Sequence, residues 1–289
     1  MPLDRLLGRC DLPAPGTPVT CAVSGGADSL ALLALAAAGG CQVTAVHVDH
    51  GLRPGSQADA DVVAAAAARF GAAFRSECVT VDQGPNLEAR ARTARYGVLP
   101  PGVLTGHTAD DQAETVLLNL LRGAGLDGLT GYRPEQRPIR RLRRRETRAL
   151  CDELGLVPLD DPTNDDPRFR RNRVRHELLP LADAIAERDV AAILARQADL
   201  LRADGALLDV LADALDPTDA GALAAAPEPL ARRAVRAWLR TGAECHPPDS
   251  ATVERVLAVA RGDALAADVG QGRSVRRSRG RLDLRDPDA

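Results

Sequence analysis

The sequence contains no lysine, and all 37 of its basic residues are arginines. This absence excludes a Walker A loop, because the lysine of that loop must reach the β- and γ-phosphates of the nucleotide. It also excludes Schiff-base chemistry and every other mechanism in which a lysine side chain of the protein is the nucleophile. A nucleotide-binding site in this chain must therefore hold phosphate groups with other donors.

Aromatic residues are scarce as well, at 2% of the 289 residues, whereas apolar residues make up 45%. The core is therefore expected to consist mainly of Ala, Leu and Val. So few aromatic rings disfavour an RNA-binding surface in which bases stack on aromatic platforms. Because the formal net charge is −3, the arginine-rich stretches 133–175 and 273–285 are, judged by charge alone, solvated faces of mixed charge.

The six cysteines are scattered and form no C-x-x-C pair. This arrangement argues against a zinc ribbon and against a thioredoxin-like redox motif. Long apolar runs are absent too, since the longest, Leu30 to Ala38, is too short to span a bilayer. The N-terminus has no charged leader with a cleavage site, so the expected compartment is the cytoplasm and no membrane partner is expected.

Strands and helices alternate through the first half of the chain. Strands are expected at 19–24, 42–48, 74–81 and 103–106, and helices at 29–38, 59–70, 87–99 and 109–122. This order predicts βαβ units and an α/β fold with a parallel, doubly wound sheet. Ligands of such sheets bind beyond the carboxyl ends of the strands, which is where the polar segments of this sequence lie.

The second part of the chain is expected to contain a helical linker and a smaller domain. A helix is expected at 168–179, and long Ala/Leu helices continue to about Leu215. Residues 217–229, rich in Pro, Asp and Ala, are expected to be a linker. We place the domain boundary between residues 182 and 183.

A Ser/Gly-rich turn joins the first predicted strand to its helix: Ser24, Gly25, Gly26, Ala27, Asp28 and Ser29. Backbone N–H groups at the start of the helix and the helix dipole together form an anion site. The glycines let the backbone approach a phosphate closely, and Ser24 and Ser29 add hydroxyl donors. Asp28 is predicted to hold Mg²⁺, which bridges phosphate oxygens to a carboxylate. A tight turn with a Ser/Asp cap is the alternative, but the strand–turn–helix context favours a nucleotide site.

Another group of polar residues follows the fourth predicted strand and opens the next helix. Thr108 and Asp111 have the spacing of a capping box. Asp110 and Glu114 share one helical face, so their two carboxylates are predicted to meet a metal or a base. His107, at the strand end, is suited to donate to a phosphate or a developing oxyanion. Helix capping alone is the alternative, and we favour a site role for His107 and Asp110.

Residues 24–29 resemble the S-G-G-x-D-S signature of the PP-loop ATP pyrophosphatases, which cleave ATP between the α- and β-phosphates. Further segments resemble the tRNA(Ile)-lysidine synthases of that superfamily: H-V-D-H-G-L-R at 47–53, R-T-A-R-Y at 92–96, G-H-T-A-D-D-Q-A-E-T at 106–115, D-P-T-N at 161–164 and R-N-R-V-R at 171–175. The resemblance implies a Rossmann-like PP-loop domain at 1–182. Residues 183–289 would then form a helical linker and a tRNA-binding domain.

The resemblance implies a ligase that joins L-lysine to carbon 2 of the wobble cytidine of tRNA(Ile) with anticodon CAU. In that reaction the cytosine 2-carbonyl oxygen attacks the α-phosphate of ATP, giving an adenylated cytidine and diphosphate. The amine of lysine then attacks carbon 2, and AMP leaves as lysidine forms. ATP and Mg²⁺ are therefore the expected cofactors, and the tRNA and L-lysine the expected partners. The lysine site and the oligomeric state, a homodimer included, are left open.

The resemblance also implies roles for individual residues. The ATP-binding residues are expected to be Ser24, Gly25, Gly26, Ala27, Asp28, Ser29 and His50. The Mg²⁺ ligands are expected to be Asp28 and Asp110, and the catalytic residues Asp28, His107, Asp110 and Arg122. The tRNA contacts are expected to be Arg92, Arg95, Asn164, Arg171, Asn172 and Arg175. The arginines within 140–148 are expected to follow an RNA backbone, and His47 is expected to pack inward.

Three alternative functions are weighed against this one. A tRNA thiolase of the same superfamily generally needs a C-x-x-C pair, an iron–sulfur cluster or a reactive cysteine, and the scattered cysteines offer no such pair. A small-molecule amidating enzyme would share the loop, but the arginine-rich elements weigh against it. A non-catalytic RNA-binding module would keep the fold, but the presence of Asp28 and Asp110 argues against it.

Overall fold

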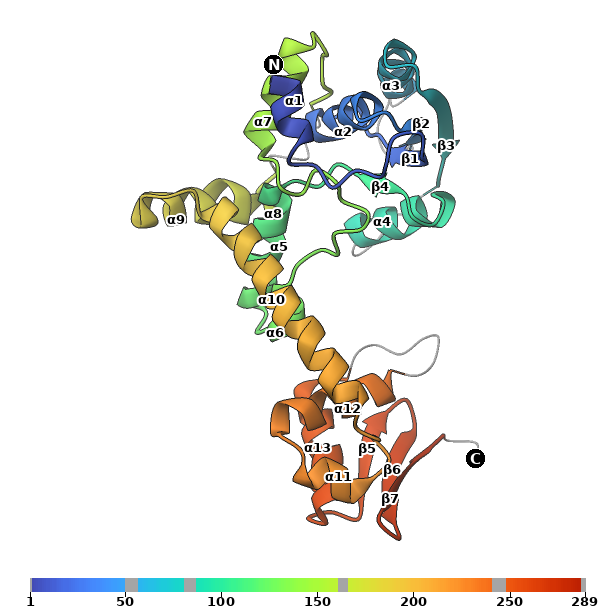
Figure 1. Ribbon diagram of the computed structural model, residues 1–289, viewed down its shortest axis with the longest axis vertical. Coiled ribbons are helices and arrows are strands. Elements are labelled where there is room, and N and C mark those ends of the chain that lie inside the picture. Colours follow the sequence, from blue (N-terminus) through green and yellow to red (C-terminus); the bar gives the residue numbers. More distant parts are fainter. Residues whose placement is uncertain (1, 50–56, 81–86, 161–165, 241–247, 287–289) are drawn as a thin grey trace. The chain divides into compact units, whose positions relative to one another are not determined.

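The computed structural model describes residues 2–49, 57–80, 87–160, 166–240 and 248–286 (Figure 1). The chain divides into two compact units, Met1–Asp199 and Leu200–Ala289, which we call the first and second unit. The division falls within helix α10 (Val190–Asp213). The boundary expected between residues 182 and 183 stays a prediction. Within the described ranges, no helix is long and apolar enough to cross a membrane.

The first unit is built on a parallel four-stranded sheet with the strand order β3-β2-β1-β4, which confirms the predicted α/β fold. Its strands are β1 (Pro18–Ala22), β2 (Gln42–Asp49), β3 (Ala73–Cys78) and β4 (Leu104–Thr105). The helices that follow them in turn are α2 (Ala27–Ala38), α3 (Gln57–Arg69), α4 (Leu87–Val98) and α5 (Ala109–Leu121).

The strand order reverses between β1 and β4, which pair through Cys21 with Leu104 and Ala22 with Thr105. The chain reaches β2 and β3 on one side of β1 and then crosses back to add β4 on the other side. The loops that leave β1 and β4 therefore diverge at neighbouring carboxyl ends. Such a reversal is where open α/β sheets bind their ligands.

The sheet is covered on both faces, and the alternation of side chains along β2 shows how. Ala45 packs into a core with α2 and α3, whereas its neighbour Val46 packs with Leu99 and Val103 in a separate cluster. Successive strand residues point to opposite faces, so a strand covered on both faces carries apolar residues at consecutive positions. The sequence V-T-A-V-H-V of β2 fits this requirement.

Helix α2 is the central helix of the first unit because it is apolar on all sides. Its residues 29–36 are all buried, as expected of a helix without a polar face. The helix packs against β1 and β2, and also against α1 (Pro2–Leu7) and α7 (Arg144–Glu153). The first turn of α2 is therefore held firmly at the end of β1, with the start of α7 beside it.

The short helix α6 (Leu126–Leu129) precedes α7, and a continuous helical stretch follows it: α8 (Arg170–Arg173), the π-helical turn η2 (Val174–Leu178) and α9 (Leu179–Ala186). The helix expected at 168–179 is therefore present, but it contains a π-helical turn and extends to Ala186. Ala113 of α5 packs against Val174, Leu179 and Ala191. This contact places α8 and η2 alongside α5.

Among its described residues, the second unit contains the C-terminal part of α10, three further helices and an antiparallel sheet in the order β5-β6-β7. Its elements are α11 (Ala220–Ala225), α12 (Glu228–Leu239), α13 (Ser250–Arg261), β5 (Ala266–Gly270), β6 (Arg273–Ser278) and β7 (Arg281–Arg285). The linker expected at 217–229 is wrong, because Asp219 caps α11 by accepting hydrogen bonds from Gly221 and Ala222. Ala220 and Leu223 are buried in the core of the unit. The Pro and Asp residues interpreted as a linker are also the residues that begin short capped helices.

Candidate active site

The loop between β1 and α2 has a conformation that requires glycine. Gly25 has φ +88°, and a Cβ atom at this residue would lie 2.4 Å from Cδ1 of Leu159. The serines brace the loop: Ser29 Oγ donates to the carbonyl of Gly26 at 2.8 Å, and the N–H of Ser24 donates to Ser29 Oγ at 3.2 Å. These hydrogen bonds hold the backbone of the loop open at the end of the sheet.

The N-cap residue of α2 is Gly26, and Ala27 is the first residue of the helix. Glycine has no side-chain oxygen to cap the first N–H groups of the helix. These N–H groups, together with the positive end of the helix dipole, favour an anion at this position. The predicted anion site is therefore compatible with the conformation of the loop.

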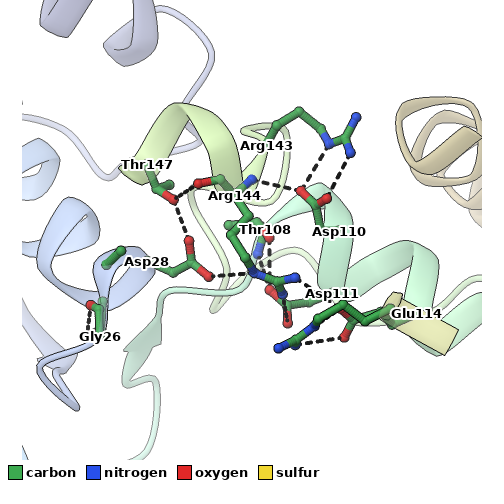
Figure 2. A network of polar contacts seen from close by, with 12 residues as sticks. Gly26, Asp28, Thr108, Asp110, Asp111, Glu114, Arg143, Arg144 and Thr147 are labelled. Atoms are coloured by element: carbon green, nitrogen blue, oxygen red, sulfur yellow. Dashed lines mark hydrogen bonds and ion pairs between the residues drawn. The ribbon is translucent and has the colours of Figure 1, made fainter. Parts of the chain in front are cut away.

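Asp28, in the first turn of α2, points toward α7 (Figure 2). Its Oδ1 accepts a short hydrogen bond from Thr147 Oγ1, and its Oδ2 accepts one from Arg144 Nε at 3.3 Å. Burial, followed by the charge of Asp111, raises the pKa of Asp28 to about 6, although Thr147 and Arg144 act in the opposite direction. Asp28 is therefore mostly ionised at neutral pH but takes up a proton in mildly acidic solution.

Both carboxylate oxygens of Asp110 are bound to the segment that begins α7. Oδ1 accepts from Arg143 Nη2 at 2.8 Å, and Oδ2 accepts from Arg143 Nε at 3.0 Å and from the N–H of Arg144 at 2.8 Å. Burial alone would raise the pKa of Asp110, but these hydrogen bonds lower it below its usual value. Asp110 is thus an ionised carboxylate that anchors the start of α7 to α5.

A buried acid lies one turn further along α5. The side chain of Glu114 is fully buried, and it accepts from Arg171 Nε at 2.6 Å, Arg175 Nε at 2.7 Å and Arg144 Nη1 at 3.1 Å. Arg144 joins Glu114 to Asp111, which accepts from its Nη2 at 3.0 Å. The carboxylate of Asp110 binds Arg143 instead, and the expectation that Asp110 and Glu114 meet a metal or a base stays a prediction.

Asp111 also caps α5, as its spacing predicted. Its Oδ2 accepts hydrogen bonds from the N–H and the hydroxyl of Thr108, both at 2.9 Å. Burial opposes ionisation, but Arg144, His107 and Arg171 together lower the pKa of Asp111 well below its usual range. A residue that the sequence allowed to be only a helix cap is therefore also part of the charged group around Arg144.

His107 is held by the strand end before it. Thr105 Oγ1 donates to the carbonyl of Gln136 at 3.1 Å, so the 2.8 Å contact between Thr105 Oγ1 and His107 Nδ1 has Nδ1–H as its donor. The His107 ring lies 4.7 Å from the ring of Tyr132, whose hydroxyl accepts from Arg171 Nη2 at 2.9 Å. The ring is thereby oriented, and its Nε2 carries a proton to donate to a ligand only in the imidazolium form.

The residues predicted to contact tRNA are placed differently from one another. Arg171 and Arg175 pair with buried Glu114, and the side-chain amide of buried Asn172 donates to the carbonyl of Asp166 at 2.9 Å. Arg95 lies over the ring of its neighbour Tyr96, with 5.4 Å between the guanidinium carbon and the ring centroid. Arg171 and Arg175 therefore help to build the site itself, and the contact of all these residues with tRNA stays a prediction.

Other predicted residues lie at the margin of the site or outside the described part of the chain. Arg122 is the exposed C-cap residue of α5. His50 and Asn164 lie outside the described residues, and so does the side chain of Arg92. His47 packs inward as expected, with 4% of its surface exposed and its Nδ1 3.0 Å from the carbonyl oxygen of Val23.

The arginines within 140–148, expected to follow an RNA backbone, bind carboxylates of the first unit. Arg140 pairs with Asp199 at 2.6 Å, Arg145 with Asp189 at 3.0 Å and Arg148 with Asp160 at 3.0 Å; Arg143 and Arg144 bind the acids of α5. Sequence reasoning missed this role, and it missed Thr147 entirely. The one available signal was that acids of α5 lie within an otherwise apolar helix and so needed nearby cations.

Cys21 and Cys151 are buried and suited to packing rather than to sulfur chemistry, whereas Cys78 is exposed. Burial raises the pKa of the Cys21 thiol to about 12 and that of the Cys151 thiol to about 11. Both thiols are therefore protonated at neutral pH, whereas the thiolate is the nucleophile in cysteine chemistry.

Across the described residues, no three His, Cys, Asp or Glu side chains are grouped so that they could hold a metal ion by themselves.

Both units match families of known proteins. Residues 5–182 match the PP-loop domain family, and residues 219–282 match the TilS substrate binding domain family. The tRNA(Ile)-lysidine synthase of Nocardia farcinica (strain IFM 10152) is 44% identical over 95% of this chain and 93% of the relative. The tRNA(Ile)-lysidine synthase of Rhodococcus erythropolis (strain PR4 / NBRC 100887) is 46% identical over 79% of this chain and 75% of the relative.

A solved structure shares the fold. The U34-tRNA thiolase NcsA from Methanococcus maripaludis, with its 4Fe-4S cluster, superposes with a TM-score of 0.55. The superposition covers 70% of this chain and 77% of the thiolase, at 18% sequence identity. At this level of identity the likeness concerns the fold alone.

Proposed function

The chain belongs to the tRNA(Ile)-lysidine synthase family of PP-loop ligases, and we propose that it joins L-lysine to carbon 2 of the wobble cytidine of tRNA(Ile) with anticodon CAU through an adenylated cytidine. It is a ligase that uses ATP and forms lysidine on tRNA(Ile). The observation that carries the finer proposal is the position of Asp28. Its carboxylate lies between the glycine loop at the end of β1 and the charged group on α5 and α7.

The loop from Ser24 to Ser29 would hold the phosphates of ATP. Backbone N–H groups at the start of α2 offer donors, and the helix dipole favours the negative charge. Gly25 lets the loop adopt its positive φ while packing closely against the side chain of Leu159. This arrangement needs no lysine, which agrees with a sequence that has none.

Mg²⁺ fits the donor set around Asp28. A carboxylate whose pKa is raised to about 6 by burial and by neighbouring Asp111 is stabilised by an added positive charge. Mg²⁺ is usually held by one or two carboxylates together with substrate phosphates, so a ready-made protein cage is not required. Bound there, the ion would neutralise charge on the phosphates. Asp110 would have to release Arg143 before it joined Asp28 as a ligand.

The remaining groups would act on the substrate directly. His107, oriented by the bond from its Nδ1–H to Thr105, would in its imidazolium form donate from Nε2 to an oxygen of the α-phosphate as the cytosine oxygen attacks. Arg122 would add charge from the end of α5. The catalytic route needs no protein nucleophile, which agrees with the protonated state of Cys21 and Cys151. For an enzyme that acts on tRNA, the cytoplasm remains the expected compartment.

The direct test is diphosphate release with ATP, Mg²⁺, L-lysine and unmodified tRNA(Ile) (CAU), followed by mass analysis of the nucleosides. We expect a lysine-sized mass gain on cytidine and loss of both signals in Asp28→Ala. The matched control is Asp61→Asn, an exposed acid on α3, which should keep full activity. Turnover that ignores lysine and requires a sulfur donor would contradict the proposal and favour a thiolase.

A further inference from the structure

The first unit has a cavity of about 260 Å³ outside the group of residues that surrounds Asp28. Arginines from three parts of the chain line it: Arg9 after α1, Arg140, Arg141 and Arg143 before α7, and Arg196 on α10. So many guanidinium groups around one cavity indicate an anionic ligand. The question is which of these cations are still available.

Two of the arginines are engaged by acids of the protein. Arg140 pairs with Asp199 at 2.6 Å and with Asp11 at 3.1 Å, and Arg143 pairs with Asp110 at 2.8 Å. Their side chains are only 14% and 13% exposed. Both belong to the frame of the cavity, and their removal would leave Asp199, Asp11 and Asp110 without these partners. Arg9 is likewise held, by Glu146.

The other two arginines are available to a ligand. Arg141 is 54% exposed, and its contact with Asp11 is long, at 3.5 Å, and shared with Arg140. Arg196 is exposed and pairs with no acid among the residues that the structure describes. The cavity thus offers two available guanidinium groups, those of Arg141 and Arg196.

Phosphate is the ligand that suits these donors, because guanidinium forks match its oxygens and keep their charge at every relevant pH. The phosphates of ATP are expected at the loop 24–29, and no residue of that loop lines the cavity. A polynucleotide substrate, by contrast, carries a phosphate at every nucleotide. The cavity is also lined by Gln112, which lies on α5 with Asp110, and by Arg143, which binds Asp110. Asp110 is one of the residues expected to act in catalysis.

We propose that this cavity binds a backbone phosphate of the tRNA through Arg141 and Arg196. The proposal rests on the proposed function, since it takes tRNA as the substrate. It also adds a site to the family pattern, because Arg196 lies between the two matched segments, residues 5–182 and 219–282. Helix α10 would then contribute to RNA binding and not only connect the two units.

The test is the salt dependence of tRNA binding for Arg196→Gln and, separately, Arg141→Gln, measured by fluorescence anisotropy without ATP or lysine. Loss of one phosphate contact to RNA should reduce the slope of log K against log salt by roughly 0.7 to 0.9 and weaken binding about fivefold at 0.1 M salt. The matched control is Arg75→Gln, which removes an equally exposed cation on β3 (63% exposed) and should change neither value. In steady state, Arg196→Gln should raise KM for tRNA and leave KM for ATP unchanged.

Failure of this proposal is distinguishable from failure of the proposed function. If wild-type protein forms lysidine but Arg196→Gln and Arg141→Gln bind tRNA as Arg75→Gln does, the phosphate site is refuted and the function stands. The second measurement is the binding of inorganic phosphate to the wild type and to Arg196→Gln, with chloride at equal ionic strength as the reference. If phosphate binds the wild type with an affinity that Arg196→Gln lowers, while tRNA binding does not change, the cavity is a site for a free anion and the RNA assignment is overturned.

Discussion

Replacing Asp28 by Asn should stabilise the first unit at neutral pH. The pKa of Asp28 is raised from 3.8 to about 6, which corresponds to about 3 kcal/mol between the folded and unfolded chain. Below about pH 4 the carboxyl is protonated in both states and contributes no difference. As the pH rises toward 6, the unfolded chain ionises while the folded chain keeps its proton, so the free energy of unfolding falls.

Above pH 6 this destabilisation is complete. Asn has the shape of the protonated carboxyl and cannot ionise, so the free energy of unfolding of Asp28→Asn does not fall in this way. We expect the variant to match the wild type at about pH 3 and to exceed it by up to about 3 kcal/mol at pH 7.5. Stability gained by removing a functional residue is the usual sign of a site selected for activity rather than for folding.

The assay is urea denaturation at both pH values, followed by far-ultraviolet circular dichroism. The protein has a single tryptophan, Trp238, which packs in the second unit, so its fluorescence provides an internal reference that should not change. Asp61→Asn removes an exposed carboxylate of α3 and should alter stability by no more than about 0.5 kcal/mol. The reasoning is refuted if Asp28→Asn is no more stable than the wild type at pH 7.5, or if the difference is the same at both pH values.

Three further changes follow from the geometry. Thr147→Val removes a hydrogen-bond donor to Asp28 and should raise the pKa of Asp28 above 6. The acid limb of the pH profile of diphosphate release should then move to higher pH, and Thr147→Ser should restore the wild-type profile. An unchanged acid limb in Thr147→Val would contradict the role of Thr147. Glu114→Gln leaves three guanidinium groups without their buried partner, and should cost about 3 to 5 kcal/mol in urea denaturation; a loss below 1 kcal/mol would show that the group is solvated. Gly25→Ala should abolish ATP binding in calorimetry, whereas Gly71→Ala, at φ +67° in open space, should leave it intact; equal binding by both would refute the steric requirement.

The parts of the site that were predictable from the sequence are those set by local spacing. The order of strands and helices, the glycine loop and the pairing of Thr108 with Asp111 depend on residues a few positions apart. The partners of Asp28 were not predictable, because Arg144 and Thr147 lie 116 and 119 residues away in the chain. Periodicity shows which face of α5 is polar, but not which helix will cover that face. The arginine-rich segment was consequently interpreted only as an RNA-binding surface, and the pairing of Arg143 and Arg144 with the acids of α5 was not foreseen.

The geometry of Arg144 also explains why guanidinium groups suit this site. Its Nε, Nη2 and Nη1 each contact a different carboxylate: Asp28 at 3.3 Å, Asp111 at 3.0 Å and Glu114 at 3.1 Å. A guanidinium presents five N–H donors in a fixed planar fork and is weakly hydrated, so it can join three acids in a partly buried place. A lysine ammonium would bring the same charge as a single, strongly hydrated point and would lose the separate contacts. Charge alone therefore does not hold the acids of α2 and α5 together; the shape of the cation does, and this requirement agrees with a sequence whose basic residues are all arginine.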